Sequence, residues 1–281
     1  MFPVLFISFL GFIYAKVKKA EPQVVSDIII YLSIPALFFS SFYKHKLIIW
    51  EIPPVLITIS FVMLTTYLLI YFLRKIYRLP LGLYLPSIFM NTAFVGFPVI
   101  FLAYGNVGLT RAIAYDFFNG IFIFTFGVYI ISGRKGAFEL FKLPFLYAAV
   151  AGIILNLSGF QLPLSLEKAI EMLGGITIPL ALLMLGFRLG QTKIKSFGLP
   201  LLSSILRMVL GAGIAWLIVT ILKLDPSLGK VLIVMSALPS AFMGLVLGEK
   251  YQIDVEFISS SIALCTLLSI IFLPILFVLL K

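Results

Sequence analysis

Residues 90–98 read Met-Asn-Thr-Ala-Phe-Val-Gly-Phe-Pro, near the middle of an apolar run that extends roughly over residues 83–104. Asn91 lies eight residues into this run, about 12 Å along a helix that rises 1.5 Å per residue. Gly96 is a poor helix former, and Pro98 cannot donate a backbone hydrogen bond. The stretch therefore predicts a helix that is interrupted close to its midpoint.

A second stretch with these properties lies near the other end of the chain. Residues 236–244 read Ser-Ala-Leu-Pro-Ser-Ala-Phe-Met-Gly, and Pro239 stands near the middle of the apolar run 227–248. A break in a helix exposes backbone groups and a partial positive charge where the second segment begins. Two such ends that face one cavity would attract an anion, most simply a carboxylate.

These two stretches supply the predicted substrate-binding residues. They are Asn91, Thr92, Pro98, Pro239 and Ser240. The alternative for each span alone is an ordinary proline kink packed against its neighbours. The matched pair favours a binding site, because paired interrupted spans at corresponding positions are typical of transporters.

The composition places these stretches in a membrane protein. Of 281 residues, 62% are hydrophobic and 11% are charged, and the mean hydropathy is +1.18. Soluble domains carry about 25% charged residues. A soluble enzyme, a disordered protein and a nucleic-acid-binding protein are therefore disfavoured, and the expected surroundings are a lipid bilayer.

Ten apolar runs follow one another along the chain. They cover roughly residues 2–16, 24–43, 52–73, 83–104, 109–132, 143–158, 168–187, 197–222, 227–248 and 255–280. Each run is continuous rather than alternating, which favours helices over a β-barrel. The predicted fold is an all-α membrane protein of ten transmembrane helices.

Weak internal similarity divides these ten runs into five plus five. Pro3 and Gly11 recur 141 residues later as Pro144 and Gly152, although proline and glycine matches can arise by chance. Five spans reverse the direction of the second copy through the bilayer, so the repeat is inverted. The predicted units are a first repeat over residues 1–132, a cytoplasmic connecting loop over 133–142 and a second repeat over 143–281.

The orientation is predicted from Lys and Arg in the loops. One side has thirteen of them: Lys16, Lys18, Lys19, Arg74, Lys75, Arg78, Arg134, Lys135, Lys142, Arg188, Lys193, Lys195 and Lys250. The other side has seven: Lys44, Lys46, Arg111, Lys168, Lys223, Lys230 and Lys281. The richer side is cytoplasmic, which places both termini outside the cell membrane.

Two charged residues lie inside predicted spans, where an ionised side chain is costly. Asp116 is either a site for a coupling proton or sodium ion or a structural anchor, with Asn119 one turn further along. Arg207 is either structural or attracts an anion. Cys265 and His45 are the only cysteine and the only histidine, so no metal site or cofactor is expected.

The sequence resembles the auxin efflux carrier family over essentially its whole length. The likeness is carried by Asn91-Thr92, Gly96-Phe97-Pro98 and Tyr104-Gly105-Asn106, by Ala237-Leu238-Pro239 and Lys250-Tyr251, and by Arg207. The resemblance implies an inverted repeat whose fourth and ninth spans are broken and cross at their prolines. It also implies export of a small organic anion, auxin-like in some members, by a mobile transport domain moving against a scaffold, in a protein that can be a homodimer.

Three points stay open at the level of sequence. Glu51 lies near the position of an acidic residue proposed to support the site in plant members, but Glu51 is shifted from that position and no lysine follows it within the span. Bile-acid sodium symporters share the fold, so a sodium-coupled organic-anion symporter is an alternative. The substrate can be a monocarboxylate, a dicarboxylate or an indole acid, moved with protons, with sodium or by facilitation.

An intramembrane hydrolase is the rival from another class. Tyr115-Asp116 resembles half of an aspartyl protease pair, but the second aspartate in a Gly-x-Gly-Asp sequence is absent. A channel would need a pore-lining ring, which the repeat does not provide. The sequence therefore predicts a secondary carrier and not an enzyme.

Overall fold

A computed structural model describes residues 2–18, 23–44, 49–133 and 140–280. Within these ranges the chain is helical, and its regular elements include no β-strand. The α-helices are α1 (Phe2–Val17), α2 (Gln23–Ile28), α3 (Ile34–Lys44), α4 (Ile52–Tyr77), α5 (Tyr84–Ile88), α6 (Phe97–Phe122), α7 (Val128–Ser132), α8 (Pro144–Ser158), α9 (Leu164–Gly175), α10 (Thr177–Gln191), α11 (Gly198–Ile221), α12 (Pro226–Ser236), α13 (Met243–Tyr251) and α14 (Val255–Leu279).

Short turns of other helical types join several of these helices. The π-helical turns are η1 (Ile29–Ser33), η4 (Thr92–Gly96) and η5 (Ile123–Gly127), and the 3₁₀ turns are η2 (Ile49–Glu51), η3 (Leu81–Leu83) and η7 (Leu140–Lys142). Gly105 interrupts α6 with φ +64° and ψ −157°. This backbone conformation suits glycine, and it bends the chain at the expected boundary between the fourth and fifth apolar runs.

The apolar runs lie on helices, as the composition predicts. Six helical stretches of the described chain are long and apolar enough to cross a bilayer: Gln23–Lys44, Ile52–Tyr77, Thr92–Ser132, Leu164–Gln191, Gly198–Ile221 and Val255–Leu279. Three further apolar helices are shorter: α1, α8 and α12. The prediction of an all-helical membrane protein is confirmed at this level.

Some predictions fall outside the described residues. The connecting loop is described only in part, because residues 134–139 are not included. The only histidine of the sequence, His45, also lies outside the described residues. So do several charged residues on which the predicted orientation rests, namely Lys19, Lys46, Arg134, Lys135 and Lys281. The orientation of the termini stays a prediction.

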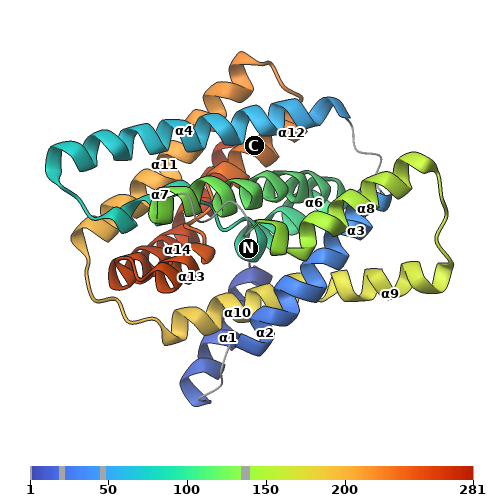
Figure 1. Cartoon of the computed structure of the whole chain (residues 1–281), viewed down its shortest axis with the longest axis horizontal. Helices are drawn as coiled ribbons and strands as arrows, with labels where there is room; N and C mark the ends of the chain where they lie inside the picture. Colours follow the sequence, from blue (N-terminus) through green and yellow to red (C-terminus); the bar gives the residue numbers. More distant parts are fainter. Residues whose placement is uncertain (1, 19–22, 45–48, 134–139, 281) are drawn as a thin grey trace.

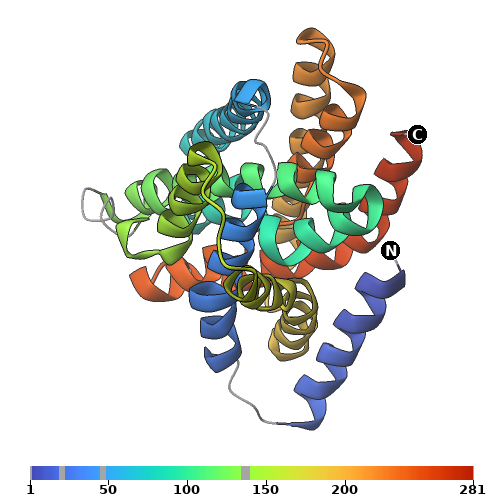
Figure 2. The same cartoon turned by 90° about the vertical axis from the view of Figure 1, so that its right-hand side faces the viewer.

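The helices pack into two bundles (Figures 1 and 2). In the first bundle α1 packs on α10, and α3 packs on α8 and α9. In the second bundle α11 packs on α4, α12 and α14, while α6 packs on α4 and α12 and α13 packs on α14. Each bundle thus combines helices from both halves of the chain.

The contact between the bundles is narrow and rich in aromatic rings. From the first bundle Phe38 and Phe145 meet Phe117 of the second, with ring centroids 6.5 and 6.2 Å from Phe117, and Phe38 also meets Phe97 at 6.4 Å. Elsewhere α10 packs against η4, and α3 against α6. These ring contacts across the boundary are apolar.

Glycines let α1 and α10 approach closely. A Cβ atom at Gly186 of α10 would overlap the backbone carbonyl of Ser8, and one at Gly11 of α1 would overlap that of Leu183. Gly190 lies one turn after Gly186 and faces Phe12 and Ala15. Small residues spaced in this way are typical of helix pairs in bilayers, because they bring the two backbones into van der Waals contact.

We predict that Gly186→Ala lowers the free energy of unfolding by about 1–3 kcal/mol, because α1 and α10 must separate to admit the methyl group. The matched control is Gly213→Ala on α11, where an added Cβ meets no atom within 4 Å. That variant should be as stable as the wild type or slightly more so, since alanine favours helix. Thermal unfolding in detergent measures both, and equal melting temperatures would contradict the close packing.

Candidate substrate site at the helix crossover

Two chain breaks meet at the centre of the second bundle. Met90 and Ser240 form an isolated antiparallel β-bridge. The backbone N–H of Asn91 donates to the carbonyl of Pro239 at 2.8 Å, and the N–H of Ala241 donates to the carbonyl of Phe89 at 2.9 Å. Because a bilayer offers no water to unpaired backbone groups, each break supplies the partners that the other needs.

The first break lies earlier than the sequence predicts. The chain leaves helix at Phe89, which is extended (φ −95°, ψ 138°), and it re-enters helix after Asn91. Pro98 instead occupies the first turn of α6, and it is not among the residues that line the two cavities described below. The expected crossing at Pro98 is therefore corrected, whereas Pro239 does lie at the crossing. A proline is well tolerated in the first turn of a helix, so Pro98 need not cause a break.

Asn91 begins the second segment of its broken helix. Its Oδ1 accepts a hydrogen bond from the N–H of Phe94 at 3.2 Å, and its backbone carbonyl accepts from the N–H groups of Val95 and Gly96. The side chain is only 3% exposed, and its Nδ2 has no hydrogen-bond partner among the described residues. One end of this amide therefore caps the helix, while the other end keeps two donor hydrogens available.

Thr92 connects this break to α6. Its hydroxyl donates to the carboxylate of Asp116 and accepts from Asn119 Nδ2 at 2.8 Å. The same Nδ2 donates to the carbonyl of Met90 at 3.0 Å. The structure thus brings Asp116 and Asn119 together with the crossover, as the sequence-based interpretation of Asp116 as an anchored polar group requires.

Ser240 serves the backbone of the crossover. Its hydroxyl donates to the carbonyl of Pro86 at 2.6 Å, and the side chain is fully buried. Its backbone N–H contacts the sulfur of Cys265 at 3.4 Å. In this conformation the hydroxyl satisfies a carbonyl at the end of α5 and does not face either cavity.

Arg207 lies behind the crossover and is fully buried. Its Nη2 donates to the carbonyl of Ser236 at 2.6 Å, at the last residue of α12. The hydroxyl groups of Ser236 and Tyr115 are 2.8 Å apart. A cation at this position stabilises the negative end of the helix dipole, which agrees with the structural interpretation of Arg207.

Glu51 is placed far from the crossover. It forms an ion pair with Arg111 of α6 at 2.5 Å, and Arg111 also contacts Ser227 at the start of α12. The whole of α12, about 16 Å at 1.5 Å per residue, separates this cluster from the break. Backbone N–H groups of Leu228 and Ser227 lower the pKa of the neighbouring Asp225 carboxyl. Glu51 therefore joins helix ends rather than supporting the site.

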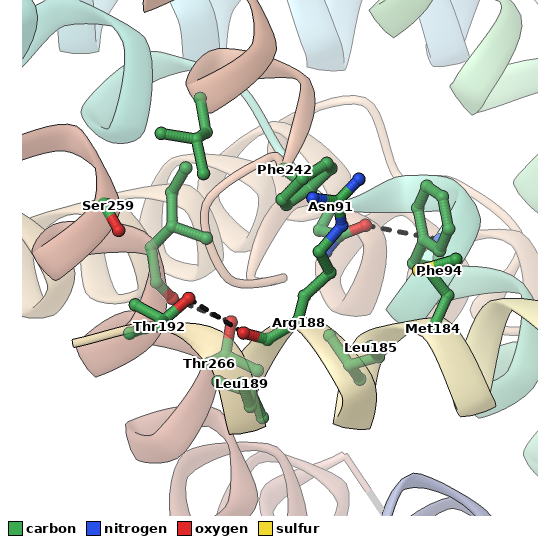
Figure 3. A pocket seen from close by; sticks show the side chains of 13 residues that line it. Asn91, Phe94, Met184, Leu185, Arg188, Leu189, Thr192, Phe242, Ser259 and Thr266 are labelled. Carbon is green, nitrogen blue, oxygen red and sulfur yellow. Dashed lines mark hydrogen bonds between the residues drawn. The ribbon is translucent and has the colours of Figure 1, made fainter. Parts of the chain in front are cut away.

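Two cavities flank the crossover where the bundles meet. The first, of about 30 Å³, lies between the crossover, α10 and α14 (Figure 3). The second, of about 100 Å³, lies between the crossover, η1, α6 and α8, and Asp116 and Asn119 line it. Asn91, Phe94 and Phe242 line both, so these residues separate one cavity from the other.

Sequence reasoning missed Arg188. It lies near the end of a predicted run and was assigned to a cytoplasmic loop, but α10 continues to Gln191 and directs its side chain into the first cavity. Its guanidinium lies 4.5 Å from the ring centroid of Phe242, and its Nη2 donates to Ser26 Oγ at 3.3 Å. The flanking residues Leu185 and Leu189 were the available signal, because they continue the apolar face past the arginine.

Comparison with known proteins defines the family. A family of membrane transport proteins, the PIN and auxin efflux family, matches residues 1–142 and 133–277. The chain belongs to this family. It is a multi-pass membrane transporter, and the resemblance found in the sequence is confirmed.

Two archaeal relatives extend this result. The chain is 30% identical over 287 residues to an uncharacterised transporter of Methanocaldococcus jannaschii, covering 95% of this chain and 92% of the relative. It is 29% identical over 286 residues to an uncharacterised transporter of Methanothermobacter thermautotrophicus, covering 96% and 94%. The family and the names of these relatives point to a transporter rather than an enzyme.

The cavities at the crossover combine a few polar side chains, among them Asn91, Arg188 and Asp116, with mostly apolar walls. Among the residues that the structure describes, no group of three His, Cys, Asp or Glu side chains gathers to hold a metal ion. Both cavities have room for at least one water molecule.

We predict that Ser240→Ala destabilises the protein by about 1–3 kcal/mol, because it leaves the buried carbonyl of Pro86 without its hydroxyl donor. The matched control is Ser87→Ala in the adjoining helix. Ser87 is also fully buried, but its hydroxyl has no partner within the described ranges, so its removal should be nearly neutral. Thermal unfolding of both variants in one detergent measures the difference in stability. An equal fall in melting temperature for the two variants would contradict the prediction.

Proposed function

We propose that this transporter is a secondary carrier that exports a small organic anion held at the crossover. The observation that carries the proposal is Asn91 at the crossover, which lines both cavities and whose buried Nδ2 has no hydrogen-bond partner in the described part of the chain. A buried donor without a partner is costly unless a ligand or water satisfies it. A carboxylate oxygen is such a partner.

The proposed architecture is ten spans in an inverted five-plus-five repeat. Support comes from the breaks after α5 and α12, which pair in antiparallel orientation. The lining of the cavities adds to this support. The first half contributes η1 to one cavity, and the second half contributes α10 to the other. Pro35 lies just after η1, and Pro179 lies in α10. The two prolines are 144 residues apart, close to the 141-residue spacing of the predicted repeat, so the two segments occupy corresponding positions in it.

The proposed mechanism is an elevator-type movement of the second bundle against the first. The crossover belongs to the second bundle, and both cavities lie between it and helices of the first. A sliding movement would therefore carry the site across the bilayer while the crossed backbone stays intact. The boundary of aromatic rings supports this mechanism, because few directional contacts have to break.

A proton or a sodium ion bound at Asp116 is the proposed coupling ion. The carboxylate lines the second cavity beside Thr92 and Asn119, which supply oxygen and amide partners. A sodium-coupled symporter of the bile-acid type is the alternative. Sodium-dependent flux that Asp116→Asn removes would favour that alternative, whereas pH-dependent flux without sodium favours proton coupling.

We predict that Asn91→Asp reduces anion flux by at least about tenfold, because the new carboxylate repels the substrate and removes the amide donor. Aspartate caps a helix as well as asparagine does, so the fold should be retained. Asn91→Ser is the neutral comparison, since it keeps a capping oxygen but lacks the donor pair. The measurement is uptake of labelled carboxylates by proteoliposomes, with melting temperature recorded for each variant. Wild-type flux in both variants would exclude Asn91 from the site.

We also predict that a cross-link between the bundles stops transport. Ser41 of α3 and Thr110 of α6 lie on opposite sides of the boundary, with hydroxyl oxygens 3.4 Å apart. Oxidation of the Ser41→Cys, Thr110→Cys double variant should reduce flux by an order of magnitude, and reduction should restore it. The two single variants are the controls. Equal flux in the oxidised and reduced states would contradict movement between the bundles.

A further inference from the structure

We propose that Arg188 binds the carboxylate of the transported anion in the first cavity, together with the amide of Asn91, and that this site accepts a single carboxylate on an apolar body. The inference rests on the proposed function and names the substrate class and a binding residue that the sequence did not reveal.

The guanidinium of Arg188 lacks a matching anion. Among the residues that the structure describes, its buried Nε has no hydrogen-bond partner, and its Nη2 has only the long contact to the neutral hydroxyl of Ser26. Within the described ranges no carboxylate lies within 4 Å of it, although Glu249 acts on it electrostatically from further away. A guanidinium in this state has the planar donor geometry that binds a carboxylate with two parallel hydrogen bonds.

Arg188 and Asn91 contribute to the same cavity from opposite bundles. Figure 3 shows the arginine extending from α10 toward Asn91 and Phe242. The Nδ2 of Asn91 is the second unpartnered donor at this place, and that side chain is 97% buried. An anion between the two side chains would therefore receive donors from both bundles, which is the arrangement a carrier needs to sense its substrate at the moving boundary.

The cavity of about 30 Å³ must widen to admit an organic anion, and its other lining residues define the surroundings that the rest of the ligand would meet. Apart from Arg188 the cavity is lined by neutral side chains, mostly apolar, including Phe94, Met184 and Leu245. The ring of Phe242 lies 4.5 Å from the guanidinium, a cation–π contact that leaves the N–H donors of the guanidinium free to bind an anion. A second carboxylate would lose its hydration without a cation to replace it, so a dicarboxylate is disfavoured.

The second cavity carries the opposite charge while Asp116 is ionised, that is, before the proposed coupling ion binds. It is lined by Asp116, and no Lys or Arg is among its lining residues. A carboxylate entering it would face repulsion, so the anion is held on the α10 side of Asn91. This difference gives the crossover one cationic and one anionic side.

The test compares an anion with its neutral analogue. Purified protein in detergent is titrated with phenylacetate, phenylacetamide and malonate, and the shift of melting temperature gives each affinity. The wild type should prefer phenylacetate to phenylacetamide. Arg188→Gln should lose about 10- to 100-fold of phenylacetate affinity and keep its phenylacetamide affinity. A purely structural role for Arg188 would change both ligands alike.

Two further variants make the result specific. Lys193→Gln removes an equal charge just beyond α10 from an exposed residue outside the cavity, and it should bind like the wild type. Arg188→Lys keeps the charge without the planar donors, so its phenylacetate affinity should fall between wild type and Arg188→Gln. If Arg188→Gln does not fold, Arg188→Lys carries the same comparison.

The outcomes separate this inference from the proposed function. An unchanged preference for phenylacetate in both Arg188 variants overturns the role of Arg188 and leaves the carrier intact. Binding of malonate without phenylacetate by the wild type overturns the single-carboxylate class alone. If neither anion binds and neither crosses proteoliposome membranes, the proposed function fails and the inference fails with it.

Discussion

A backbone group buried in a bilayer must find a partner within the protein, and the crossover depends on this constraint. Two helices end in mid-membrane, and each break is satisfied by the other through the paired groups of Phe89, Asn91, Pro239 and Ala241. Side chains complete the pairing, since Ser240 satisfies Pro86 and Arg207 satisfies Ser236. Most polar atoms at the crossover thus serve the backbone and are unavailable to a ligand.

Several buried polar atoms near the crossover have no partner within the described chain, among them Nε and Nη1 of Arg207, and only those that line a cavity are placed to meet a ligand. Asn91 Nδ2 and Arg188 Nε are buried donors without partners within the described chain, and both side chains line one cavity. Asp116 and Asn119 line the other. Because the two cavities lie where the bundles meet, a ligand in either cavity would contact helices of both bundles.

Individual residues show which parts of the site can be predicted from the sequence. Asn91 and Pro239 were predicted from their depth in two matching runs, and both lie at the crossing. Pro98 was assigned to the break because proline interrupts helices, but a proline in a first turn is harmless, and the capping side chain of Asn91 marks the true start. Glu51 is a candidate from the sequence because it lies near the position of an acidic residue in plant members. Its ion-pair partner Arg111 lies sixty residues further along the chain, so the sequence alone does not reveal the pair.

The sequence by itself determined the helical membrane fold, the apolar runs and the two interrupted spans, because hydropathy and helix-breaking residues act locally along the chain. Only the tertiary structure decided which groups remain unpaired, since pairing depends on neighbours far apart in sequence. Arg188 illustrates the difference. Along the chain it is a charge at the end of an apolar run, and only the packing of α10 against the crossover makes it a half-buried cation that lines a cavity.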